Sequence, residues 1–237
     1  MQNKIPRVIH YCWFGEKKLP DDVKKCIQTW KKICPGYEIR RWDESNTPIE
    51  KIPFVRDAYE AKAWAFVSDF VRLKVVYEYG GIYFDTDVEL IKDVEWLLKY
   101  SCFLARQHSG EINTGLGFGA QKESSVIRKM LQEYEKVTFK QKCLQELACP
   151  ILNTRAIECY GFTNTGKVQV QDDVIVLSPE YMDPYSSGKK VENLLCEKTI
   201  SIHHYSASWT TGLQRVKRKT ARIIGEDKII QIKKIIC

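Results

Sequence analysis

The sequence predicts an α/β protein, a single domain built on a mixed, mostly parallel sheet with helices on its faces. Short apolar segments rich in β-branched and aromatic residues alternate along the chain with longer segments of helical periodicity. The 237 residues, 44% of them hydrophobic, suffice for one sizeable core, and no linker-like stretch or internal repeat divides them. This alternation is typical of a sheet flanked by helices.

The first part of the chain follows the alternation closely. Residues 7–14 are apolar, rich in β-formers and followed by a glycine, so they form the first predicted strand. Residues 20–30 are amphipathic with two aspartates in the first turn, which favours a helix. A Pro-Gly turn then leads to a second strand at 37–42. A long helix at 61–79 closes at Gly80-Gly81.

Shorter elements complete the predicted sheet. An apolar strand at 82–84 follows the long helix directly. Further strands are expected at 102–105, 116–120, 174–177 and 199–203, with a helix at 124–136. Ligands of such sheets lie beyond the carboxyl ends of the strands. Because Trp13 and Asp85 both occupy such ends, we expect them to share a crevice.

Composition argues against several classes of protein. No apolar run reaches the length of a membrane span, and the first residues lack the apolar core of a signal peptide. The nine cysteines are scattered without a C-x-x-C pair, which favours reduced, mostly buried thiols in a cytoplasmic protein. The net charge is +7, but no aromatic-and-basic module such as an RNP sequence is present, so nucleic acid is not an expected partner.

The basic charge is concentrated at the end of the chain. Residues 214–237 interleave Lys and Arg with pairs of Ile, whereas residues 1–213 hold the predicted domain. Two interpretations stay open. The segment is either a helix that packs its Ile face on the core, or a basic amphipathic helix that contacts the inner face of the cell membrane.

An Asp-x-Asp pair is the most informative local feature. Asp85 and Asp87 follow the apolar strand 82–84, and side chains at i and i+2 on a strand point the same way. Two adjacent carboxylates repel unless a cation lies between them, and Mg²⁺ or Mn²⁺ prefers oxygen ligands. A solvated turn is the alternative. An EF-hand does not fit, because Leu90 and Trp96 stand where its glycine and glutamate are required.

Other polar or aromatic residues are also either ligand-binding or purely structural. Asp69 and Arg72 share a face of an otherwise apolar helix, either as an internal ion pair or facing a polar ligand. Trp13 either stacks on a nucleobase or belongs to the core. The loop at 111–117, with Asn113, suits sugar contacts or a turn. The histidines near residue 204 offer an imidazole that would complete a metal site with two carboxylates, or are structural.

Four ordered motifs together carry a family resemblance. They are the strand and glycine at 5–15, Ser-Asp-x-x-Arg at 68–72, Tyr-Gly-Gly-Ile-Tyr-Phe-Asp-x-Asp at 79–87, and His-x-x-x-Ser-Trp at 204–209. The chain thereby resembles glycosyltransferases of the Asp-x-Asp sugar-binding type, family 32, which includes capsular-polysaccharide and yeast mannosyl transferases. That group is distantly similar to the glucosylating clostridial toxins. Residues 121–200 carry no part of the resemblance.

The resemblance implies a GT-A-like fold, a UDP- or GDP-sugar donor, Mn²⁺ or Mg²⁺, and retention of anomeric configuration. It implies a saccharide acceptor, lipid-linked in capsule-building relatives. By the same resemblance, Trp13 would stack on the base, Asp69 and Arg72 would contact the sugar, and Trp209 would contact the phosphates. Asp87 and His204 would bind the metal directly. Asp85 would contact the ribose or sugar and would reach the metal through a water. Larger relatives carry insertions after the position of Asp87 that shape the acceptor site, and this chain has none there.

Two other classes of function are consistent with parts of the sequence. A sugar nucleotidyltransferase also uses an aspartate pair on a sheet edge, but the segment at 14–19 is a poor version of its Gly-rich phosphate loop. A noncatalytic sugar- or membrane-binding module would not need Asp69 and Arg72 together with the aspartate pair. A glycosyltransferase is therefore the predicted function.

Overall fold

A computed structural model describes residues 3–140, 144–185 and 193–206 of the chain. Its main sheet has seven strands in the order β2-β1-β3-β6-β5-β8-β7. The strands are β1 (Val8–Cys12), β2 (Glu38–Trp42), β3 (Gly81–Tyr83), β5 (Cys102–Ala105), β6 (Phe118–Ala120), β7 (Gln169–Gln171) and β8 (Val174–Leu177). All run in one direction except β6 and β7, which are antiparallel to their neighbours. The sheet is mixed and mostly parallel, as predicted.

A second, two-stranded sheet joins distant parts of the chain. Strand β4 (Val88–Leu90) directly follows the Asp-x-Asp pair and is antiparallel to β9 (Ser201–His203), near the end of the described residues. Its register pairs Val88 with His203. The sequence predicted β9 but not β4, because the pairing of β4 is set by residues far away in the chain.

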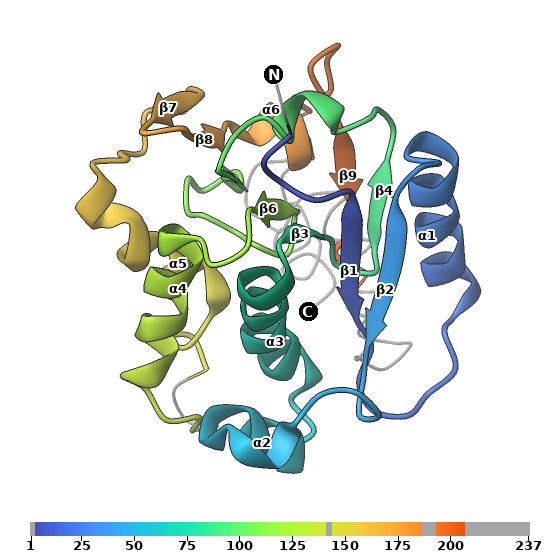
Figure 1. The fold of residues 1–237 in the computed structure, drawn as a ribbon, viewed down its shortest axis with the longest axis vertical. Coiled ribbons are helices and arrows are strands. Elements are labelled where there is room, and N and C mark those ends of the chain that lie inside the picture. Colours follow the sequence, from blue (N-terminus) through green and yellow to red (C-terminus); the bar gives the residue numbers. More distant parts are fainter. Residues whose placement is uncertain (1–2, 141–143, 186–192, 207–237) are drawn as a thin grey trace, which may run out of the picture.

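The helices cover both faces of the main sheet (Figure 1). They are α1 (Asp21–Ile33), α2 (Pro53–Glu60), α3 (Trp64–Tyr79), α4 (Ser125–Glu135), α5 (Cys149–Ile157) and the short α6 (Pro179–Met182). Helix α1 packs near β4 on one side, while α2, α3, α4 and α5 form a continuous group on the other. The sequence predicted α1, α3 and α4 but neither α2 nor α5.

Strand β5 shows how alternation builds a core on each face. Cys102 and Leu104 belong to the apolar cluster under α3, α4 and α5, whereas Phe103 and Ala105 belong to the cluster under α1. All four side chains are buried, because the sheet is covered on both sides. The described helices include none long and apolar enough to cross a membrane.

The junction between α3 and β3 depends on two glycines. Gly80 ends α3 with a φ of 67°, and Gly81 follows with a φ of 108°. A β-carbon on Gly81 would lie 2.7 Å from the carbonyl oxygen of Val8, so only glycine lets β3 approach β1. This close approach places the ends of β1 and β3 side by side, where the candidate site lies.

Candidate active site

A pocket of about 280 Å³ lies beyond the carboxyl ends of β1 and β3. The end of β1, the first turns of α3, the turn after β3 and the start of α5 all contribute to its wall. Six of the site residues predicted from the sequence line the pocket, namely Trp13, Asp69, Arg72, Asp85, Asp87 and Asn113, whereas the predicted His204 does not. The predicted crevice shared by Trp13 and Asp85 is confirmed.

The Asp-x-Asp pair has a different local structure from the one expected. Asp85 and Asp87 lie in a turn between β3 and β4, where the amide of Val88 donates to the Asp85 carbonyl at 3.0 Å, and not on a strand. Strand alternation therefore does not explain their common direction. The turn still brings carboxylate oxygens of both residues within 4.8 Å of each other and of an imidazole nitrogen of His203.

The histidine of this group is His203, whereas the family motif pointed to His204. His203 Nε2 lies 3.1 Å from Asp87 Oδ1, and His204 Nε2 lies 2.9 Å from Glu89 Oε2. Adjacent side chains at the end of β9 diverge, so only one of the two faces the aspartates. In this structure His203, and not the predicted His204, therefore lies with the Asp-x-Asp pair.

The two aspartates occupy different electrostatic environments. Burial raises the pKa of Asp85, against the effect of Arg72 nearby. Burial also opposes ionisation of Asp87, but the facing His203 and the backbone N–H of Ser206 together lower its pKa. That N–H donates to Asp87 Oδ2 at 2.6 Å. Asp87 is therefore the better-stabilised anion of the pair.

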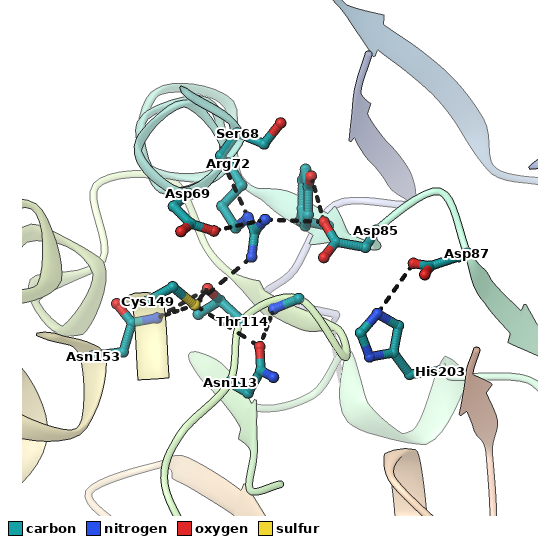
Figure 2. A network of polar contacts seen from close by, with 12 residues as sticks. Ser68, Asp69, Arg72, Asp85, Asp87, Asn113, Thr114, Cys149, Asn153 and His203 are labelled. Atoms are coloured by element: carbon teal, nitrogen blue, oxygen red, sulfur yellow. Dashed lines mark hydrogen bonds and ion pairs between the residues drawn. The ribbon is translucent and has the colours of Figure 1, made fainter. Parts of the chain in front are cut away.

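Arg72 lies between two carboxylates (Figure 2). Its Nη2 is 2.9 Å from Asp69 Oδ1 and 3.0 Å from Asp85 Oδ1, and its Nε donates to the Ser68 carbonyl at 3.2 Å. The Tyr83 ring lies beneath the guanidinium at 5.0 Å, and the Tyr83 hydroxyl donates to Asp85 at 2.9 Å. Asp69 and Arg72 thus form an internal ion pair and also line the pocket.

Asp69 differs from an ordinary aspartate. Burial raises its pKa to about 7, although Arg72 opposes this shift. The Asp69 side chain is nearly closed off from solvent, with 12% of its surface exposed. The Asp69 carboxyl group is therefore harder to ionise than an exposed aspartate, and its oxygens can accept hydrogen bonds from hydroxyl groups of a ligand.

Asn113 anchors the loop on the opposite wall of the pocket. Its side chain accepts from the amide of Gly115 at 2.8 Å and donates to Gln107 at 2.9 Å. A β-carbon on Gly115 would lie 2.5 Å from Asp85 Oδ2, so this glycine lets the loop approach the aspartate. The sequence suggested sugar contacts or a turn here, and the side chain both lines the pocket and stabilises a turn.

Trp13 lies at the other end of the pocket. It is partly buried, and its indole N–H donates to the carbonyl of Lys17 at 2.6 Å, which fixes the ring just after β1. The predicted phosphate contact, Trp209, and the segment 214–237 lie outside the described residues.

Besides His203, sequence reasoning missed two members of the site. Tyr83 was assigned only to a buried strand, although its position two residues before Asp85 was a signal of contact. Cys149 was one of nine scattered cysteines, and the sequence contained no signal that placed it in the pocket wall. Seven described cysteines are free, and five of them are buried.

Comparison with known proteins agrees with this geometry. Residues 20–104 match the family described as a glycosyltransferase sugar-binding region containing a DXD motif. Inositol phosphoceramide mannosyltransferase 3 of Schizosaccharomyces pombe is 32% identical over 123 residues, which are 48% of this chain and 33% of that protein. An uncharacterized glycosyltransferase of Acanthamoeba polyphaga mimivirus is 29% identical over 100 residues, 38% of each chain. The chain thus matches about a third of the length of these relatives.

A solved structure extends the comparison to the fold. The PaToxG glycosyltransferase superposes with a TM-score of 0.52 at 20% identity, over 66% of this chain and 69% of that one. The similarity shows a common α/β fold of the GT-A type. Residues 20–104 are thus similar to a glycosyltransferase sugar-binding region with a DXD motif, and the chain has the fold of such an enzyme.

Proposed function

We propose that this protein is a metal-dependent, retaining glycosyltransferase of family 32 that transfers a hexose from a UDP- or GDP-sugar to a saccharide acceptor. One observation carries the proposal. A single pocket joins an aromatic ring at the end of β1, an arginine held between two carboxylates, and a group of two carboxylates and an imidazole that shares Asp85 with the arginine. These features match the base, the sugar and the diphosphate of a nucleotide sugar, respectively.

The donor set fits a divalent cation. Asp85, Asp87 and His203 each offer one ligand atom, and these atoms lie within 4.8 Å of one another. Carboxylate oxygens with one imidazole suit Mn²⁺, and the carboxylates also suit Mg²⁺ when substrate phosphates supply further oxygens. When bound, the ion would neutralise charge that develops on the leaving diphosphate.

The remaining residues bind and orient the donor. Trp13, fixed by its bond to the Lys17 carbonyl, offers a flat face to a base. Asp69 and Arg72 offer an acceptor and donors to sugar hydroxyls, and Asp85 holds Arg72 from the other side. Because these groups are already paired with one another, their geometry is set before the substrate arrives, which lowers the entropic cost of orientation.

Retention of configuration is what the family resemblance implies, and the carboxylates near the sugar subsite bear on how it would be achieved. Glycosidases use one carboxylate as nucleophile and another as acid/base. Here Asp69 and Asp85 are both engaged by Arg72, and Asp87 by His203, so no described carboxylate in the pocket is assigned to attack. For a retaining enzyme, this favours same-face substitution over a double displacement. The bond from the anomeric carbon to phosphate breaks, the bond to the acceptor oxygen forms, and the acceptor proton passes to the leaving diphosphate.

The proposal also covers the acceptor and the cellular location of the enzyme. Three similar proteins are named inositol phosphoceramide mannosyltransferases, which supports testing a mannosyl donor and a lipid-linked saccharide first. A cytoplasmic enzyme at the inner face of the membrane, held there by residues 214–237, would reach such an acceptor. Capsular or surface-glycan synthesis is the corresponding role.

The deciding experiment is product analysis after incubation with UDP-glucose, UDP-galactose and GDP-mannose in the presence of Mn²⁺. Release of nucleoside diphosphate that depends on the metal supports transfer or slow donor hydrolysis. Release of pyrophosphate would instead indicate a nucleotidyltransferase. Binding of a nucleotide sugar without any product, with or without saccharide acceptors, would indicate a noncatalytic module.

A further inference from the structure

The start of α5 contributes a thiol to the pocket wall. Cys149 is buried, with 4% of its surface exposed, and it lines the pocket next to Ala148 and Pro150. Nothing in the proposed chemistry uses this residue. Burial raises its pKa to about 12, so the group is a neutral thiol rather than a nucleophilic thiolate.

The sulfur joins three parts of the structure that are far apart in the sequence (Figure 2). It lies 3.8 Å from Arg72 Nη1 on α3 and 3.8 Å from Asn113 Oδ1 on the loop before β6. It also lies 3.2 Å from the hydroxyl of Thr114. Behind it, Asn153 on the next turn of α5 donates to the sulfur at 3.3 Å and to Thr114 at 2.9 Å.

The arginine contact is the important one, because it involves Nη1, whereas both ion pairs given for Arg72 with described carboxylates are made by Nη2. Nη2 is shared by Asp69 and Asp85, and Nε binds a backbone carbonyl. Nη1 contacts the sulfur of Cys149, which is a weak acceptor at a long distance. The sulfur therefore holds the guanidinium in place while leaving the Nη1 hydrogens able to bind an oxygen of a ligand.

Gly115 confirms that this corner of the pocket is closely fitted. A β-carbon there would lie 3.0 Å from Asn113 Oδ1 and 3.2 Å from Arg72 Nη1. The two polar atoms that contact Cys149 thus converge on one small region, between the loop and α3. A change in the size or polarity of residue 149 would shift both atoms together.

We propose that Cys149 is a positioning residue for the donor sugar: through Arg72 and Asn113 it sets the affinity for the sugar, and it has no part in binding the nucleotide. Thr114 and Asn153 support the thiol from behind. The inference rests on the proposed function, since it names which side chains act on the sugar part of the same donor. It predicts that variants separate the binding of a nucleotide sugar from that of its nucleoside diphosphate.

The test compares dissociation constants for UDP-glucose and UDP, or for GDP-mannose and GDP, measured by calorimetry with Mn²⁺. For Cys149→Ala we expect the dissociation constant of the nucleotide sugar to rise about fivefold, because several weak contacts are lost. The dissociation constant of the nucleoside diphosphate should stay within about twofold of the wild-type value. Cys149→Ser should recover part of the affinity, since a hydroxyl keeps a polar group at this position although its oxygen lies farther from Arg72 and Asn113. The KM for the donor should rise with little change in kcat.

A second variant protects the test from a failure of folding. Thr114→Val keeps the shape of a fully buried side chain but removes the hydroxyl that contacts the thiol. We expect it to cause a smaller change in the same direction, about threefold and limited to the nucleotide sugar. Cys34→Ala is the matched control, because Cys34 is a buried thiol in the opposite core, away from the pocket. Its loss should leave the ratio of the two dissociation constants, nucleotide sugar over nucleoside diphosphate, unchanged.

Three results would overturn the inference, and they can be told apart. If Cys149→Ala and Thr114→Val weaken both ligands equally, or neither, Cys149 has only a structural role and the proposed function survives. If the wild-type protein binds no nucleotide sugar, the proposed function fails and the inference fails with it. Failure of Cys149→Ser to recover affinity lost in Cys149→Ala would also contradict the positioning role.

Discussion

His203 Nε2 lies 3.1 Å from Asp87 Oδ1, across the strand pair formed by β4 and β9. The register that pairs Val88 with His203 brings the ring to the residue before Val88. The neighbouring His204 contacts Glu89 instead. Two adjacent histidines therefore have separate carboxylate partners, and only one of these partners belongs to the Asp-x-Asp pair.

The first prediction separates these two histidines. His203→Gln should weaken Mn²⁺ binding at least about tenfold, because a metal ligand is lost, whereas His204→Gln should change it by no more than about twofold. Calorimetric titration of Mn²⁺ in the presence of a nucleoside diphosphate measures both. The opposite ranking would restore His204 as the ligand implied by the family resemblance.

The second prediction concerns Asp87, the carboxylate with the lowered pKa. Asp87→Asn removes the anionic ligand while keeping the size of the side chain, so metal-dependent turnover should fall by about a hundredfold or more. EDTA should have the same effect on the wild-type protein. Glu89→Gln is the control, since it removes a carboxylate from β4 that lies outside the metal group. Full activity of Asp87→Asn in EDTA would contradict the metal site.

The third prediction concerns stacking of Trp13 on the nucleobase of the donor. Trp13→Ala should raise the donor KM about tenfold, corresponding to a stacking loss of ~1–3 kcal/mol, with little change in melting temperature. Trp96→Ala is a suitable control, because Trp96 is 38% exposed and does not line the pocket. An unchanged KM together with a large drop in melting temperature would place Trp13 in the core.

The predictable part of the fold was the part with a local signal. Strand β8 was expected at its observed bounds, and α3 differs from its predicted range only at the start. Helix α5 was missed because its nine residues begin with Cys and Pro and lack a clear apolar stripe. Strand β4 was missed because its pairing with β9 is set by residues more than a hundred positions away.

The same limit applies to the candidate site. Trp13 and Asp85 were placed together because both follow strands of a parallel sheet, which is a topological rule. Which of two adjacent histidines faces Asp87 depends on the register of β9, and no local pattern encodes it. The wall formed by Cys149 depends on how α5 packs against α3 and the loop before β6, which only the three-dimensional structure shows.

The last prediction concerns His10, which lies on β1 away from the metal group. Its Nε2 bonds the Gly80 carbonyl at 2.8 Å, and its Nδ1 lies 3.0 Å from the indole N–H of Trp42. Because a carbonyl only accepts and an indole N–H only donates, the ring must be neutral with its proton on Nε2. Burial lowers the pKa of His10 to about 4, from an ordinary value of 6.5.

Between pH 6.5 and about 4, the unfolded chain therefore binds a proton at this histidine while the folded protein does not. The stability that neutral His10 contributes is thus fully present above pH 6.5 and is lost as the pH falls toward 4. We expect about 2 kcal/mol to be lost between pH 8 and pH 5 on this account, since one pKa unit corresponds to about 1.4 kcal/mol. His10→Gln keeps a donor for Gly80 and an acceptor for Trp42 but cannot titrate. Urea unfolding of both proteins at the two pH values measures the effect, and groups common to both cancel in the difference. Equal loss of stability in the wild type and the variant would show that His10 takes up its proton in the folded state as readily as in the unfolded chain.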